Sequence, residues 1–319
     1  MKDFLSLQHL LECPECHKGK PLITKNSDYL TCDYCDSRYL ISHGRPVLLR
    51  LENTIFNQNN YHNISKPPPE KPIKSWIRFF QSPSVNLSRK RVLTKLNQSL
   101  KHLKSATVLV VGGGRQRLWL DKLLGADNRV TVVYCDIDIY SDIDFFCDAH
   151  DLAFSDQVFD AVVVTAVMQL VLYPERVAAE IHRVLKVHGY LYSEIPFMQQ
   201  VHEGAYDFTR YTLSGHRRLF NGFTEIEAGM VSGPSTALGW AIENFLLAFF
   251  VQSVIRKVVK AIVRLMFFWL KHIDRILVYR PGAMDGASCT YFYGQKINGR
   301  VDDSKIIDLY KGAKYLKHT

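Results

Sequence analysis

The sequence lacks the features that mark fibrous, repetitive or disordered chains. Its 319 residues include only 12 prolines and 18 glycines, and no segment recurs at a fixed period, which excludes collagen-like, solenoid and propeller architectures. With 47% hydrophobic and 22% charged residues, the composition is that of a soluble globular protein and excludes global disorder. At roughly 100 to 200 residues per domain, the length accommodates about two units.

The sequence also lacks a secretory signal and a long uncharged apolar run. The first residues, MKDFLSLQHLLECPEC, contain no basic region followed by an apolar stretch, so we expect a reducing, cytoplasmic compartment. In the apolar segment 240–280 the longest uncharged stretch, 244–255, has 12 residues, whereas a membrane span needs about 18. A simple transmembrane helix is therefore not expected.

Charge is distributed unevenly along the chain. Lys and Arg outnumber Asp and Glu by 17 to 8 in residues 1–105 and by 13 to 6 in residues 240–319, whereas the acids lead by 17 to 10 in residues 106–239. A polyanionic partner would therefore bind the flanks, and the chemistry of the middle is not built around a basic groove.

Four of the seven cysteines form two CxxC pairs separated by fifteen residues: Cys13 and Cys16, then Cys32 and Cys35. Two such turns brought together place four thiolates around one tetrahedral ion, so residues 1–50 are predicted to be a zinc ribbon. The alternative is a pair of disulfides in a secreted domain. The remaining cysteines, Cys135, Cys147 and Cys289, lie in apolar runs and are expected to be core residues.

Short apolar runs alternate with amphipathic stretches from Thr107 onward, which predicts an α/β fold with a parallel sheet and crossover helices. Before this region, the Asn- and Pro-rich residues 51–75 predict a linker, and residues 76–103 predict a basic helical stretch. The seven predicted strands cover residues 107–111, 129–135, 142–148, 159–165, 190–195, 223–231 and 289–297. We expect a doubly wound sheet built from 76–239 and 281–319, with a helical insertion, 240–280, between the last two strands.

The first of these strands runs directly into Gly112, Gly113 and Gly114. Glycines at this turn let the chain reverse tightly and let a ligand approach the backbone, with the next helix pointing its amino end at the ligand. A nicotinamide-binding GxGxxG motif would need a third glycine where Arg117 stands. Asp136 and Asp138 follow the second strand, where a carboxylate can accept hydrogen bonds from ribose hydroxyls, so a dinucleotide or an S-adenosyl cofactor fits.

The stretch that begins with CDAHDLAF and SDQVFDAVVV and continues in PERVAAEIHRVLKVHGYLYSEIPF resembles the class I S-adenosylmethionine-dependent methyltransferases, of the type 11 kind. The resemblance covers about residues 106–235 and implies a seven-stranded Rossmann-like sheet. It implies that the glycine turn lines the methionine end of the cofactor, Asp136 its ribose, and Asp148 with Ala149 its adenine. The family's acidic residue two positions before the first glycine is Val110 here, and its next loop glycine is Gln116.

After the fifth strand comes PFMQQVHEGAYDFTRYT, which resembles an acceptor-covering loop of methyltransferases encoded among polysaccharide-assembly enzymes. The resemblance suggests His202 or Asp207 as a catalytic base and Arg210 as the holder of an acidic acceptor group. The alternative is that Asp207 and Arg210 form an internal ion pair. The fourth strand is followed by TAVMQ rather than the Asn/Asp-Pro-Pro-aromatic motif of amino-directed nucleic-acid methyltransferases, which disfavours that class.

The amino-terminal ribbon has a resemblance of its own, carried by LLECPECHKGKPL and CDYCDSRYLISHGRPVLL. It is similar to the small zinc-ribbon activator of tRNA and release-factor methyltransferases. This resemblance implies a stabilising or substrate-platform role, with a structural zinc that takes no part in the chemistry.

The insertion 240–280 carries basic residues at spacings of four and seven, beside the apolar run Phe267, Phe268, Trp269 and Leu270. Its basic residues on one helical face are Arg256, Lys260, Arg264, Lys271 and Arg275. A basic stripe beside aromatics predicts a helix in the headgroup region of an anionic membrane. The alternative is a helical cap on the sheet with a solvated charged face.

Together these features predict a cytoplasmic methyltransferase, peripheral on the inner face of the membrane, that O-methylates a small-molecule glycan or a lipid-linked cell-envelope intermediate. One alternative is an RNA methyltransferase that uses the ribbon and basic flanks as a platform. A non-enzymatic zinc-ribbon scaffold, with a methyltransferase fold that no longer works as an enzyme, is the third hypothesis.

Overall fold

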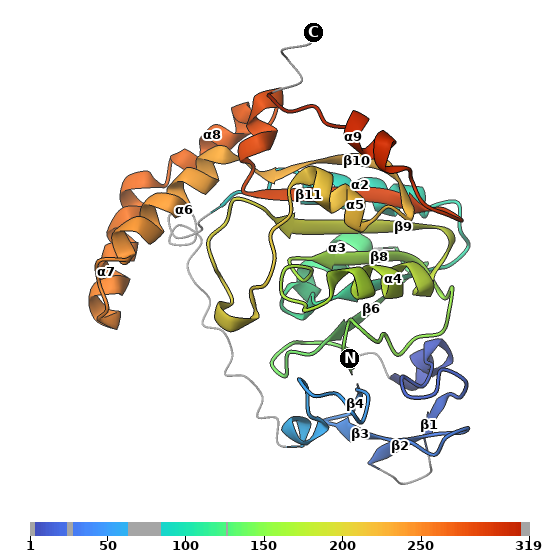
Figure 1. Cartoon of the computed structure of the whole chain (residues 1–319). Coiled ribbons are helices and arrows are strands. Elements are labelled where there is room, and N and C mark those ends of the chain that lie inside the picture. Colours follow the sequence, from blue (N-terminus) through green and yellow to red (C-terminus); the bar gives the residue numbers. More distant parts are fainter. Residues whose placement is uncertain (1–3, 24–27, 63–83, 126, 314–319) are drawn as a thin grey trace.

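An eleven-stranded sheet organises the chain (Figure 1), in the order β1-β2-β3-β4-β7-β6-β5-β8-β9-β11-β10. The computed structural model describes residues 4–23, 28–62, 84–125 and 127–313. The strands are β1 (Pro21–Ile23), β2 (Tyr29–Cys32), β3 (Arg38–Ser42), β4 (Arg45–Leu48), β5 (Ala106–Val111), β6 (Val130–Asp136), β7 (Phe145–Cys147), β8 (Phe159–Thr165), β9 (Leu185–Pro196), β10 (Phe223–Ser232) and β11 (Cys289–Lys296).

Strands β5 to β11 form the doubly wound sheet that the sequence predicts. The neighbours β7, β6, β5, β8 and β9 are parallel, and β11 and β10 complete the sheet as antiparallel strands. Every residue of β8 is buried, because a central parallel strand is covered by helices on both faces and so needs a continuous apolar run. The predicted fold class is confirmed.

Helices cover both faces of this sheet. On one face α2 (Arg89–Ser99) and α3 (Arg117–Leu124) pack apolar side chains, including Leu93 and Leu120, into a shared core. On the other face α4 (Pro174–Val184) and α5 (Leu213–Leu219) pack against the strands, and Ile181 of α4 lies in the second core. A last short helix, α9 (Asp303–Asp308), follows β11. Chain order reverses between β5 and β8, which creates the crevice where open α/β sheets bind ligands.

The predicted ribbon continues the same sheet. Strand β4 pairs in parallel with β7, with Val47 opposite Phe146 and Leu48 opposite Cys147. The 3-10 helix η1 (Phe4–Leu10) and the residues after it contact the domain as well, because the backbone N–H of Glu12 donates to the carbonyl of Ala153 at 3.1 Å. Buried ribbon side chains share one core with residues of β7: Leu7, Leu10, Leu11, Leu30 and Tyr39. The ribbon and the α/β unit are therefore one packed body.

Part of the predicted linker 51–75 is ordered against the sheet. Residues 51–62 include the 3-10 helix η2 (Gln58–Tyr61), in which Tyr61 is buried and contacts Phe146 with tilted rings, 4.9 Å between ring centroids. The Tyr61 hydroxyl donates to the carbonyl of Ile137 at 2.8 Å. The rest of this linker, and the residues up to 83, lie outside the described part of the chain, so the predicted helical stretch 76–103 is represented by α2.

The insertion 240–280 forms three helices that extend away from the sheet (Figure 1): α6 (Pro234–Leu247), α7 (Ser253–Phe267) and α8 (Leu270–Leu277). No helix among the described residues is long and apolar enough to cross a membrane. We call these three helices the helical arm.

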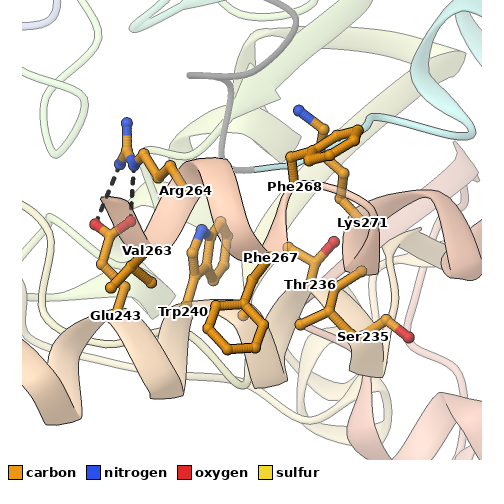
Figure 2. A pocket seen from close by; sticks show the side chains of 11 residues that line it. Ser235, Thr236, Trp240, Glu243, Val263, Arg264, Phe267, Phe268 and Lys271 are labelled. Atoms are coloured by element: carbon orange, nitrogen blue, oxygen red, sulfur yellow. Dashed lines mark hydrogen bonds and ion pairs between the residues drawn. The ribbon is translucent and has the colours of Figure 1, made fainter. Parts of the chain in front are cut away.

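The residues of the predicted basic stripe are divided between two helices: Arg256, Lys260 and Arg264 belong to α7, and Lys271 and Arg275 to α8. Arg264 and Lys260 pair with Glu243 of α6, and Arg264 Nε lies 2.7 Å from the Glu243 carboxylate (Figure 2). Arg256 donates to carbonyls at the end of α6, and Lys271 is buried. Arg264 is half-buried and Lys271 is buried, whereas Arg256, Lys260 and Arg275 are exposed.

Candidate active site and metal site

The glycine turn lies at the carboxyl end of β5, beside the loops that follow β6 and β8. Gly112 has φ of +71°, and a Cβ there would lie 2.2 Å from Cγ2 of Val167, just after β8. A Cβ on Gly114 would lie 2.4 Å from the Cβ of Ser141, in the loop after β6. At Gly113 the clash would be with Val110 at 2.3 Å. All three positions favour glycine, because a Cβ would overlap a neighbouring side chain at each of them, and Gly112 also has a left-handed backbone conformation.

Asp136 ends β6 directly beside this turn. Its Oδ1 accepts hydrogen bonds from the backbone N–H groups of Ile137 and Asp138, at 2.8 and 3.1 Å. Ser141 donates its hydroxyl to Asp136 and lies equally close, 3.2 Å, to Asp138. Burial raises the pKa of Asp136 above its ordinary value. Backbone N–H groups thus fix the loop after β6 through Oδ1 of Asp136. Oδ2 has lone pairs that can accept a further hydrogen bond from a hydroxyl group.

Asp148 and Ala149 follow β7 and are buried. The Asp148 carboxylate accepts from His150, with 2.7 Å between Oδ1 and Nδ1, and from Asn53 Nδ2 at 2.9 Å. Burial acts to raise the pKa of Asp148, but the hydrogen bonds from His150 outweigh it, and the net pKa is lowered. The Asp148 carboxylate is therefore ionised and held in one position by its hydrogen bonds, at the border of the candidate site.

Two residues of this region escaped prediction, Asn53 and Tyr61, because both lie in the stretch predicted to be a linker. They approach the carboxyl ends of β6 and β7 from the ribbon side. Only the tyrosine, an aromatic residue within the polar run NQNNYHN, is a signal in the sequence that this stretch packs on something.

Three buried polar atoms at the end of β8 and in the loop after β9 have no hydrogen-bond partner among the described residues. They are Thr165 Oγ1, Gln169 Oε1 and Gln200 Oε1. Buried polar atoms are almost always paired, so polar atoms without a protein partner fit contact with a polar ligand. Together with the glycine turn and Asp136, these atoms fit a cofactor that carries ribose hydroxyls and charged groups.

Gln116 stands where the family has its next loop glycine, and its side chain is hydrogen-bonded to α2. Arg89 Nη1 donates to Gln116 Oε1 at 2.7 Å, and the same guanidinium pairs with Glu194 near the end of β9. Tyr192 donates its hydroxyl to Glu194 at 2.5 Å. The contacts among Arg89, Gln116 and Glu194 stabilise the segment that follows the glycine turn, and the sequence did not predict them.

The predicted acceptor loop follows β9. The structure brings Asp207 and Arg210 together as an ion pair, and Arg210 also donates to the carbonyls of Gln199 and Gln200. The hydrogen bond from Arg210 lowers the pKa of Asp207, so this carboxylate is a poor proton acceptor. His202 is 70% exposed and lies 3.3 Å from Glu203. The pair therefore shapes the loop, and of the two proposed bases His202 is the more accessible.

A cavity of about 550 Å³ lies between this loop and α6. This volume is in the range of small-molecule sites. Its lining residues are Gln199, Gln200, Val201, Asp207, Phe208, Thr209, Arg210 and Asn244. A second cavity lies between α6, α7 and α8, lined in part by Trp240, Phe267 and Phe268 (Figure 2), but at about 30 Å³ it has room for about one water molecule.

The four ribbon cysteines converge. Their sulfur atoms all lie within 4.8 Å of one another, and the pairs Cys13–Cys35 and Cys16–Cys32 are each 3.7 Å apart. In a tetrahedron with Zn–S bonds of about 2.3 Å, the sulfur atoms are about 3.8 Å apart. The donor set and its spacing therefore fit a zinc ion.

Comparison with known families and structures matches this geometry. Residues 111–193 match the methyltransferase domain family. This segment runs from the end of β5 into β9, and it contains the glycine turn, Asp136 and Asp148. Residues 111–193 are therefore a methyltransferase domain segment, as the resemblance predicted. A search of curated proteins finds no match.

Several solved structures are similar over most of the chain. The Haloferax volcanii complex of a methyltransferase with its activator is 16% identical, with a TM-score of 0.40 over 67% of this chain and 100% of that chain. A Galdieria sulphuraria protein described as a sarcosine dimethylglycine methyltransferase is 12% identical, with a TM-score of 0.41 over 69% and 97%. The Haemonchus contortus phosphoethanolamine N-methyltransferase 2 with S-adenosylmethionine is 15% identical, with a TM-score of 0.40 over 65% and 53%.

Proposed function

We propose that the chain transfers a methyl group from S-adenosylmethionine to a hydroxyl of a glycan or of a lipid-linked cell-envelope intermediate. The observation that carries the methyl-transfer part is the juxtaposition of the glycine turn, Asp136 and Asp148. All three lie at the carboxyl ends of the neighbouring strands β5, β6 and β7, inside the matched methyltransferase domain. Open α/β sheets bind their ligands at this edge.

Methyl transfer to a hydroxyl is an in-line displacement. A carbon–oxygen bond forms as the carbon–sulfur bond breaks, the sulfonium becomes a neutral thioether, and the hydroxyl proton passes to a base. S-adenosylmethionine, when bound, supplies the electrophilic methyl group. The residues of the chain hold the two reactants in line, exclude water and take the proton.

The residues available to hold the cofactor are those of the strand ends. Asp136 would accept the ribose hydroxyls, with Asp138 beside it, and Asp148 with Ala149 would border the adenine. Thr165 and Gln169 offer polar atoms that lack partners among the described residues, which supports a polar ligand in contact with β8.

The cavity between the loop and α6 supports a hydroxyl-rich acceptor. Its polar lining includes Gln199, Gln200 and Asn244, side chains that both donate and accept hydrogen bonds. Arg210, fixed by Asp207, presents a cation to an acidic group of the acceptor, and His202 is the candidate base. RNA remains the alternative acceptor, supported by the basic flanks and opposed by the carboxylates of this edge.

We also propose a structural zinc ion bound by Cys13, Cys16, Cys32 and Cys35. The thiolate spacing supports it, and no position is left open for a substrate when four cysteines bind the metal. The zinc would therefore stabilise the ribbon without taking part in methyl transfer.

The function is tested with the purified full chain and S-adenosylmethionine labelled in its methyl group. Membrane lipid extract, a polysaccharide fraction and total RNA are offered separately. We expect label in the lipid or glycan fraction, and none there with Asp136→Ala. Label in RNA alone would overturn the acceptor proposal. No label in any fraction, together with no cofactor binding by calorimetry, would overturn the methyltransferase proposal in favour of the scaffold.

A further inference from the structure

The outer side of the helical arm is an exposed apolar surface. Several apolar side chains of α7 are exposed to solvent, among them Val254 at 69%, Leu265 at 60% and Met266 at 61%. We call the following set the outer face: Val254, Val258, Ile262, Leu265, Met266 and Trp269. At 100° per residue the five of these positions that belong to α7 fall within an arc of about 120°, and the buried Val263 lies outside it.

Exposed apolar side chains also lie on the two sides of α7 in the sequence. Phe245 and Phe249, near the end of α6, are 65% and 68% exposed and contact each other edge to face. On the α8 side, Ile276 and Tyr279 are 66% and 84% exposed. This many exposed apolar side chains on three packed helices indicate an interaction site rather than a solvated cap.

The exposed charged residues of segment 240–280 are all positive. Residues 240–280 contain seven Lys or Arg and two acids. Both acids are buried: Glu243 is 7% exposed and Asp274 is 0% exposed. Asp274 is moreover occupied by backbone N–H groups at the start of α6. Exposed cations, among them Lys257, Arg275 and Arg280, therefore flank the outer face without exposed acids in the same segment.

We propose that the outer face docks onto an anionic lipid membrane, with α7 lying parallel to the surface. An apolar face bordered by cations matches the boundary between acyl chains and anionic headgroups. Trp269 and Tyr279 are the residue types that favour this boundary. The 15 residues of α7 extend about 22 Å, less than a bilayer core of about 30 Å, so the helix lies in the surface.

A second copy of the chain fits this surface less well than lipid. Pairing two outer faces would bring two sets of exposed cations together without an exposed acid of the arm to neutralise them. A membrane with anionic headgroups neutralises the same cations as it covers the apolar face.

Docking would also place the acceptor cavity near the membrane, because Asn244 of α6 lines that cavity. This step rests on the proposed function, whereas docking itself does not depend on methyl transfer. The two can therefore fail separately.

The test is co-sedimentation of the full chain with vesicles of phosphatidylcholine, with and without phosphatidylglycerol. The triple variant Val258→Ser, Ile262→Ser, Leu265→Ser removes apolar bulk from exposed positions only, so folding is expected to survive, as checked by its melting temperature. The matched control is Val187→Ser, Ile226→Ser, Ile307→Ser, three exposed apolar residues elsewhere on the molecule.

We expect the wild type and the control to sediment with the anionic vesicles, and the outer-face variant to bind about a hundredfold more weakly or worse. A Lys257→Gln, Arg275→Gln, Arg280→Gln variant should lose affinity for anionic vesicles and keep any weak affinity for neutral ones. Salt should weaken wild-type binding without abolishing it. Binding of wild type and outer-face variant that is equal, or absent for both, would overturn the proposal. So would a wild-type dimer in sedimentation equilibrium that the outer-face variant dissociates.

Discussion

Asn53 donates a hydrogen bond to Asp148 across 95 residues of sequence, with 2.9 Å between Nδ2 and Oδ2. The donor belongs to the stretch that follows the ribbon, and the acceptor to the edge where the cofactor is proposed to bind. A second contact, from Tyr61 to the carbonyl of Ile137, fixes the same stretch against the loop after β6. The ribbon side of the molecule thus forms part of the wall of the candidate site.

Replacing Asn53 by Ala should weaken binding of S-adenosylmethionine. The Asp148 carboxylate loses one of its donors, and a hydrogen bond to a charged group contributes about 1.5 to 3 kcal/mol. We expect the dissociation constant measured by calorimetry to rise about tenfold or more. Asn59→Ala, in the exposed helix η2 of the same stretch, is the control and should change it little. Equal effects of the two variants would contradict a specific role for Asn53.

Asp136→Ala should reduce cofactor affinity further. Two hydrogen bonds from ribose hydroxyls are lost, each worth roughly 1.5 to 3 kcal/mol, so binding should fall about a hundredfold or more. Asp136→Asn keeps an acceptor oxygen and should lose less. Asp302→Ala, at an exposed position before α9, serves as the control. Unchanged affinity in Asp136→Ala would mean that the ribose does not bind at this strand end.

Cys32→Ser should lose the zinc ion and destabilise the whole chain, not the ribbon alone. Leu11, Leu30 and Tyr39 share a core with β7, and β4 is hydrogen-bonded to that strand. The loss should be on the order of several kcal/mol. Metal analysis and thermal unfolding followed by circular dichroism measure both effects, and Cys289→Ser is the control for loss of a thiol. Metal-free wild type, prepared without chelator, would refute the zinc site.

Glu194→Gln should destabilise the fold by about 3 to 5 kcal/mol, because the partly buried Arg89 would keep its charge without a carboxylate. The Glu194 side chain is 2% exposed and the Arg89 side chain 20%. Asp127→Asn breaks the comparatively exposed pair with Arg129 and should destabilise the fold much less, because water screens an exposed ion pair. Chemical denaturation of the two variants provides the comparison, and similar losses would argue against a structural role of the Arg89–Glu194 pair.

The free energy of unfolding should decrease as the pH is lowered, in part because of His216. Its ring is fully buried between Ser193 and Thr290, and burial, together with the charge of Arg217, lowers its pKa from 6.5 to about 3. Below pH 6.5 the unfolded chain therefore binds a proton that the folded chain does not bind. Stability contributed by this group is present above that pH and decreases by up to about 1.4 kcal/mol per pH unit down to about pH 3.

His216→Gln should flatten this pH dependence, whatever its effect on stability at neutral pH. Urea unfolding of the wild type and the variant at a series of pH values measures the difference in slope. Identical slopes would mean that His216 is protonated in the folded chain.

Strands were predictable where a long apolar run ends at turn residues. Strand β8 has the bounds predicted for residues 159–165. Strand β9 begins at Leu185, five residues before the predicted start, because the chain passes from α4 into extended backbone without a loop. The pairing of β4 with β7 was not predictable, since no crossover helix connects them and a run as short as RPVLL carries no information about its partner.

Side-chain contacts between distant segments were also beyond prediction. The spacing of Arg256, Lys260 and Arg264 places them on one side of a helix, but the ion pairs of Lys260 and Arg264 depend on the position of Glu243 on α6. Likewise the sequence offered two roles for Asp207 and Arg210, and only the folded loop distinguishes an ion pair from two separate catalytic groups. The periodicity of a sequence describes a single helix or strand, whereas these ion pairs depend on how two segments are placed relative to each other.

The parallel pairing of β4 with β7 has a consequence for synthesis. Val47 leaves the ribosome about a hundred residues before its partner Phe146, which at about 5 to 20 residues per second is a delay on the order of ten seconds. During that interval one edge of the ribbon has unpaired backbone groups, the situation in which strands add to other chains. The strand at this edge has only four residues and begins with the charged Arg45, and both features disfavour pairing with other chains until β7 is made.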